Sequence, residues 1–108
     1  MKIVLICSNG ITGTDLEKYL PFETNEIVTL GERCLSDSAI NHLEARGIVP
    51  VDFRYATEKL SRSQAEKRTM NLLGKADIVL AFWDGKSTKT KELIDRCNVM
   101  RVPLRVFV

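Results

Sequence analysis

Short apolar runs alternate with amphipathic segments along the whole chain, and this alternation constrains the fold more than any other feature. Strands that alternate with helices form parallel sheets, because each helix carries the chain back over the sheet in a right-handed crossover. We therefore predict one α/β domain over residues 1–108, a Rossmann-like three-layer sandwich with a five-stranded parallel sheet. The expected strands are Lys2–Cys7, Glu26–Leu30, Val49–Arg54, Ile78–Trp83 and Pro103–Val108.

Hydroxyl side chains indicate where the helices begin. Thr14 with Glu17, and Ser61 with Gln64, have the spacing of capping boxes, in which two side chains satisfy backbone N–H groups of the first turn. Ser36 or Asp37 can cap the helix between these two, and Gly47 can end it. Helical spacing places the following residues on buried faces: Leu16, Tyr19, Leu20, Ala39, Ile40, Leu43, Ala65, Thr69, Leu72, Leu73, Ala76, Leu93, Ile94, Cys97 and Met100.

Two polar turns are expected to meet at one place. A chain of this kind usually has the strand order 3-2-1-4-5, and ligands bind where that order reverses, between the first and fourth strands. This geometry brings residues 8–14 and 84–90 together. The second turn offers hydroxyls, an ammonium group and the N–H groups of a helix start, which are the groups that hold phosphate or carboxylate. The sequence thus indicates an anion site.

A solvated loop explains the same residues without a ligand, because strand-to-helix turns of any parallel α/β fold face water. Lys86 can act as a point charge on phosphate or remain solvated. Arg68, on the helix before the fourth strand, can reach a phosphate or pair with Glu66 or Glu58. Both interpretations stay open at this point.

The sequence lacks the motifs of several common functional sites. Residues 9–13 do not contain the G-x-G-x-x-G of a redox dinucleotide site, and a Walker A loop ending at Ser87 would need a glycine at Leu80. No Ser/His/Asp or Cys/His set is present to form a nucleophile. His42 is the only histidine, which disfavours a metal site. We predict neither a cofactor nor a metal.

Charge and hydropathy restrict the partners. Lysine and arginine outnumber aspartate and glutamate by only 16 to 14 and are scattered, which gives little support for nucleic-acid or membrane binding. No apolar segment approaches the roughly 20 residues of a membrane helix, and the first residues do not form a signal peptide. We predict a cytoplasmic protein. The three cysteines are odd in number and never form C-x-x-C, which favours reduced thiols.

Two stretches carry a resemblance to a known family. Arg68-Thr69-Met70 on a helix, followed by residues 76–91 with the sequence ADIVLAFWDGKSTKTK, resembles the small YspA-like members of the SLOG superfamily. These are Rossmann-like relatives of the LOG phosphoribohydrolases, once called lysine-decarboxylase-like proteins, and of the DNA-processing protein DprA. The likeness covers the C-terminal half and extends to residues 3–9, whereas the middle of the chain agrees only in the order of its elements.

The resemblance implies a nucleotide-derived ligand in the turns after strands one and four, and often a homodimer. The LOG branch carries P-G-G-x-G-T-x-x-E, whose glutamate assists cleavage of an N-glycosidic bond. With Thr90 aligned to the threonine of that motif, Leu93 stands in place of the glutamate, and Glu92 is one residue away, about 100° around the helix. Lys89 replaces a glycine of the phosphate loop. Only Thr90 and Arg68 carry over.

Our leading hypothesis is a SLOG-like domain that binds a nucleotide or a phosphorylated nucleoside derivative. The alternatives are a nucleoside monophosphate phosphoribohydrolase using Glu92 or Asp84, and a dimeric protein-interaction module. The substitution at Leu93 leaves open whether the protein is an enzyme. The residues expected to bind the ligand are Ser8, Asn9, Gly10, Arg68, Asp84, Gly85, Lys86, Ser87, Thr88 and Thr90.

Overall fold

The computed structural model describes residues 1–31, 35–53 and 61–108. Five strands form one parallel sheet in the order β3-β2-β1-β4-β5, which confirms the predicted fold class and strand order. The strands are β1 (Lys2–Cys7), β2 (Glu26–Gly31), β3 (Val51–Asp52), β4 (Ile78–Phe82) and β5 (Leu104–Phe107).

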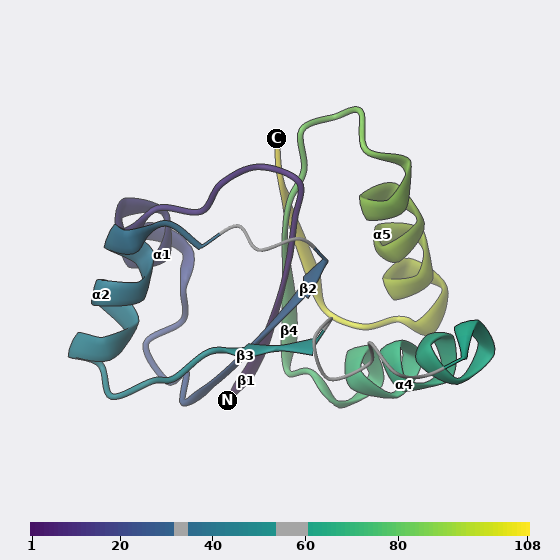
Figure 1. Ribbon diagram of the computed structural model, residues 1–108, viewed down its shortest axis with the longest axis horizontal. Helices are drawn as coiled ribbons and strands as arrows, with labels where there is room; N and C mark the ends of the chain where they lie inside the picture. The colour runs from purple at the N-terminus through teal and green to yellow at the C-terminus, as the bar shows by residue number, and fades with distance from the viewer. Residues whose placement is uncertain (32–34, 54–60) are drawn as a thin grey trace.

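Helices cover both faces of the sheet, as in a Rossmann-like sandwich. The helices α1 (Gly13–Tyr19) and α2 (Asp37–Ala45) lie on one side, and α4 (Arg62–Lys75) and α5 (Thr88–Met100) lie on the other (Figure 1). None of these helices combines the length and the apolar character that a bilayer crossing requires.

The core has two parts, one on each face of the sheet. Alternate residues of a strand point to opposite faces, so Ile3 and Leu5 of β1 pack with the α1–α2 side, whereas Val4 and Ile6 pack with the α4–α5 side. These four side chains are at most 1% exposed. The near-continuous apolar composition of β1 follows from its central position, where both of its faces are covered.

The helix caps agree with the sequence in two places and differ in one. Ser61 and Gln64 form the predicted capping box of α4, and Ser36 caps α2 by accepting a hydrogen bond from the N–H of Ala39 at 3.2 Å. The first helix is capped by Thr12 and Asp15, not by Thr14 and Glu17, so that prediction is wrong by two residues. The helix includes Gly13, whose N–H donates to the Ser38 hydroxyl of α2, a tertiary contact that local spacing does not reveal.

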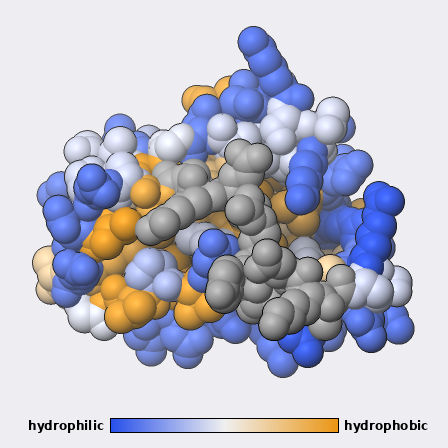
Figure 2. Space-filling model, viewed as in Figure 1, coloured by the Kyte–Doolittle hydropathy of each residue, from blue (hydrophilic) through white to orange (hydrophobic). Residues whose placement is uncertain are grey.

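The third strand is shorter than predicted. The sequence indicated Val49–Arg54, but β3 contains only Val51 and Asp52, and Arg54 lies outside the described residues. Pro50 precedes the strand and has no N–H to donate to a ladder. Val49 and Val51 are 82% and 53% exposed, and Figure 2 shows apolar surface beside α2 on the face viewed.

The cysteines differ from one another. Cys97 of α5 is a free, buried thiol, and burial raises its pKa. Cys7, at the end of β1, is disulfide-bonded, so the prediction of reduced thiols is wrong for this residue. The spacing of cysteines along a chain does not report which of them the fold brings together. The prediction for Cys34 lies outside the described residues.

Candidate functional site

The turns that follow β1 and β4 are joined by hydrogen bonds, as the strand order predicts. The N–H groups of Ser8 and Asn9 donate to the Phe82 carbonyl at 2.9 and 3.3 Å. In return, the N–H of Asp84 donates to the Ser8 hydroxyl at 3.0 Å. Gly10 follows directly in the first of these turns. The two polar turns therefore lie side by side at the switch point of the sheet.

The carboxylate of Asp84 occupies two of the N–H donors of the second turn. Its Oδ1 accepts hydrogen bonds from the N–H groups of Lys86 and Ser87, both at 2.8 Å. These bonds lower the pKa of the Asp84 carboxyl below its ordinary value of 3.8, because they favour the charged form. Gly85 adopts φ +79° between these residues, a conformation that glycine reaches without strain.

Two further contacts close the turn. The Ser87 hydroxyl caps α5 by accepting from the N–H of Thr90 at 3.3 Å, and the Trp83 indole donates to the Ser87 carbonyl at 3.0 Å. Thr90 itself is 4% exposed, so its side chain is part of the interior. A phosphate could use the N–H groups of Lys86 and Ser87 only by displacing Asp84. The N–H groups of Thr88 and Lys89 have no acceptor among the described residues.

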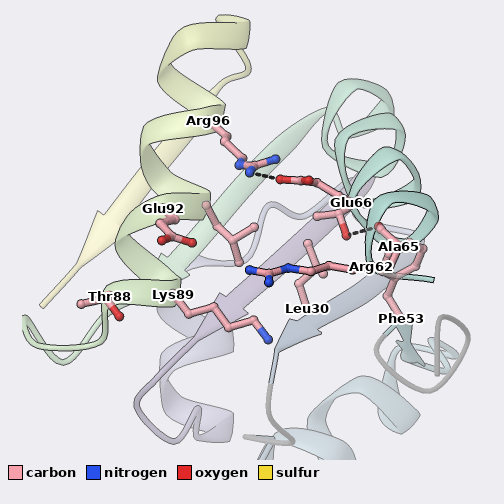
Figure 3. A pocket seen from close by; sticks show the side chains of 11 residues that line it. Leu30, Phe53, Arg62, Ala65, Glu66, Thr88, Lys89, Glu92 and Arg96 are labelled. Carbon is pink, nitrogen blue, oxygen red and sulfur yellow. Dashed lines mark hydrogen bonds and ion pairs between the residues drawn. The ribbon is translucent and has the colours of Figure 1, made fainter. Parts of the chain in front are cut away.

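A cavity of about 500 Å³ lies between α4 and α5, next to this turn (Figure 3). Its walls come from one face of each helix, from the end of β2 and from the residue after β3. The lining residues are Leu30, Phe53, Arg62, Ala65, Glu66, Thr69, Thr88, Lys89, Glu92, Leu93 and Arg96. The described part of the wall thus combines apolar side chains with three cationic and two anionic groups.

One pair of these charges is neutralised within the wall. Arg96 of α5 forms an ion pair with Glu66 of α4, and its other terminal nitrogen contacts the Met70 sulfur at 3.3 Å. Within the described part of the chain, Arg62, Lys89 and Glu92 form no ion pair. Arg62 and Lys89 extend from opposite helices into the space between them (Figure 3). Among the described residues, the cavity wall therefore offers two cations and one carboxylate to a ligand.

Of the ligand-binding residues that the sequence indicated, only Thr88 lines this cavity. Arg68 is exposed on α4 and does not line it. The reason is helical geometry: Arg62, Glu66 and Thr69 share a face at spacings of four and three residues, and Arg68 is offset from Thr69 by about 100°. Arg68 is not paired with Glu66 either, since Glu66 binds Arg96. Glu58 lies outside the described residues.

Glu92 and Leu93 both line the cavity, so the one-residue offset from the LOG motif does not remove the carboxylate from this region. Sequence reasoning did not select Arg62, Lys89 or Arg96 as ligand-binding residues. Their spacing along one face of each helix was the available signal, but it became informative only once α4 and α5 were known to face each other across a gap.

The described residues contain no group of three or more histidine, cysteine, aspartate or glutamate side chains that could hold a metal ion. The molecule is thus a Rossmann-like α/β protein with a cavity of mixed charge beside its switch point. Comparisons of the chain with protein-family models, with curated proteins and with solved structures found no match.

Proposed function

We propose that this protein binds a nucleotide or a phosphorylated nucleoside derivative, with the phosphate in the cavity between α4 and α5. The observation that carries the proposal is the pair of unpaired cations, Arg62 and Lys89, that enter one cavity from two helices. A volume of about 500 Å³ falls within the range of small-molecule sites, roughly 300–1,000 Å³.

The start of α5 adds to the attraction for an anion. The N–H groups of Thr88 and Lys89 have no acceptor among the described residues, and the positive end of the helix dipole lies at the same place. Arg62 offers a planar fork of donors for phosphate, and Lys89 a compact charge. Leu30, Phe53 and Leu93 provide apolar surface in the same cavity, against which a base or sugar can pack.

The resemblance to SLOG proteins supports the same ligand class but favours a different position. It predicts phosphate in the turn after β4, around Gly85, Lys86 and Ser87. In this chain the Asp84 carboxylate occupies two N–H groups of that turn, which favours the neighbouring cavity. Thr88 belongs to both regions, since it follows the capping residue Ser87 and lines the cavity.

Calorimetric titration tests the proposal with AMP, ADP-ribose, NAD, a cytokinin-type riboside monophosphate and inorganic phosphate. We expect binding of at least one nucleotide, weakened about 10-fold or more by Arg62→Ala or Lys89→Ala, because each removes a charged hydrogen bond to phosphate. Lys86→Ala and Arg68→Ala are matched controls, since each removes a cation outside the cavity. A larger loss with Lys86→Ala would place the phosphate in the turn. Indifference to every nucleotide at millimolar concentration would contradict the proposal and favour a protein-interaction module.

A phosphoribohydrolase activity is a second candidate, favoured by Glu92 in the cavity wall. A carboxylate near the sugar can stabilise the positive charge that develops when an N-glycosidic bond breaks. If this activity exists, purified protein will release free base from a nucleoside monophosphate, and Glu92→Gln will abolish the release. Chromatography of the titration mixtures detects the product. Binding without release would make the protein a binding module.

A further inference from the structure

Glu92 is the one carboxylate of the cavity wall that forms no ion pair among the described residues. The other, Glu66, is paired with Arg96. Glu92 lies one helical turn after Lys89 on the same face of α5 (Figure 3), and side chains at this spacing are neighbours. The side chain is exposed and no described residue holds it in place. Its carboxylate is therefore free to interact with a ligand.

Among the described lining residues, two unpaired cations face one unpaired carboxylate. Arg62 and Lys89 are positive, and Glu92 next to Lys89 is negative, while Arg96 and Glu66 cancel each other. One phosphate group can be neutralised by the two cations. A second phosphate attached to the first would have to share the cavity with Glu92, and like charges in close contact oppose binding.

An ionised carboxylate can only accept hydrogen bonds, so its natural partner is a donor. The hydroxyl groups of a sugar are donors that lie close to the phosphate in a sugar phosphate. Resting on the proposed function above, we infer that Glu92 is a specificity-determining residue: it selects ligands with a single phosphate and neighbouring hydroxyl groups, and it rejects diphosphates. The substrate or ligand class is thus a nucleoside monophosphate or a sugar monophosphate.

The test compares the binding of AMP, ADP and 2′,3′-dideoxyadenosine monophosphate by calorimetry. Wild-type protein should bind AMP at least about 10-fold more tightly than ADP, because Glu92 opposes the second phosphate. Glu92→Gln should bring the two affinities within about three-fold of each other, mainly by strengthening ADP binding. The same variant should reduce the preference for AMP over the dideoxy compound, because a charged acceptor binds a hydroxyl more strongly than a neutral one.

Asp95→Asn is the matched control, since it removes one negative charge from the same helix. Asp95 is paired with Lys91 and does not line the cavity, so this variant should keep the wild-type ratio of AMP to ADP affinity. If AMP binds and Glu92→Gln leaves both preferences unchanged, the inference is wrong and the proposed function stands. Equal changes of these affinity ratios in Asp95→Asn would also overturn it, because the effect would then depend on the net charge of the helix and not on the position of Glu92. Failure of wild-type protein to bind any of the three compounds would overturn the inference, whereas the proposed function would be overturned only if every nucleotide of its own titration also failed to bind.

Discussion

The two helical layers of this protein are built differently on the same sheet. On one face, α1 and α2 touch directly: the N–H of Gly13 donates to the Ser38 hydroxyl at 3.0 Å. A methyl group on Gly13 would lie 2.7 Å from the Ser38 carbonyl oxygen. On the other face, α4 and α5 leave a cavity between them, and among the described residues the polar side-chain contacts between these two helices are made by Arg96.

The difference follows from the residues at each helix contact. A glycine with hydroxyl neighbours lets two helices approach until their backbones meet, as at Gly13 and Ser38. Long charged side chains keep helices apart, because their ionised ends must reach water, a partner or a ligand. Arg62 and Lys89 are such residues. One layer of the sandwich is thus closely packed, and the other leaves a cavity that we propose to be a binding site.

The largest expected difference concerns a leucine from each layer. Leu43 of α2 is fully buried, so Leu43→Ala should lower the free energy of unfolding by about 3 kcal/mol through lost burial and a new void. Leu93 of α5 is half-buried beside the existing cavity, so Leu93→Ala should cost about 1 kcal/mol. Urea denaturation monitored by Trp83 fluorescence measures both values. Equal losses would mean that the two layers are packed alike.

Replacing one glycine in each layer by alanine should change stability in opposite directions. Gly13→Ala should lower the free energy of unfolding by about 1–3 kcal/mol, because its methyl group would meet the Ser38 backbone. Gly74→Ala in α4 meets only the flexible end of Met100, at 3.5 Å, and should raise the stability by up to about 1 kcal/mol through better helix propensity. Thermal unfolding compares the two variants. Destabilisation by both would show that α4 is packed more closely than the structure indicates.

The smallest effect concerns the turn that begins α5. Hydrogen bonds from Ser87 and Lys86 lower the pKa of Asp84 below 3.8, so the folded state binds this proton more weakly than the unfolded state. The resulting stabilisation is fully present above the unfolded pKa and is lost as the pH falls through the folded pKa. A carboxyl NMR titration should report a value below 3.8. Asp84→Asn should flatten the acid side of the stability curve, and an unchanged curve would contradict the prediction.

Much of the fold could be read from the sequence because it depends on local periodicity. The predicted strand Lys2–Cys7 has the same bounds as β1. The predicted capping box of Ser61 and Gln64 begins α4. Two elements differ from the prediction. The first helix begins before Thr14 because Thr12 and Asp15 form its capping box, a spacing that the sequence offered as well, and β3 is short at the edge of the sheet.

The pattern of apolar and polar residues was sufficient to predict the parallel sheet, because strands that alternate with helices are joined by right-handed crossovers. The usual topology of such chains then predicted the strand order and the meeting of the turns at Ser8 and Asp84. The positions of the unpaired charges became known from the three-dimensional structure. In the structure, the Asp84 carboxylate accepts hydrogen bonds from two N–H groups of its own turn. Arg62, Lys89 and Glu92 line one cavity. The apolar pattern of a helix indicates which of its faces is buried, but the cavity between α4 and α5 depends on side chains that are 19 to 34 residues apart in the sequence.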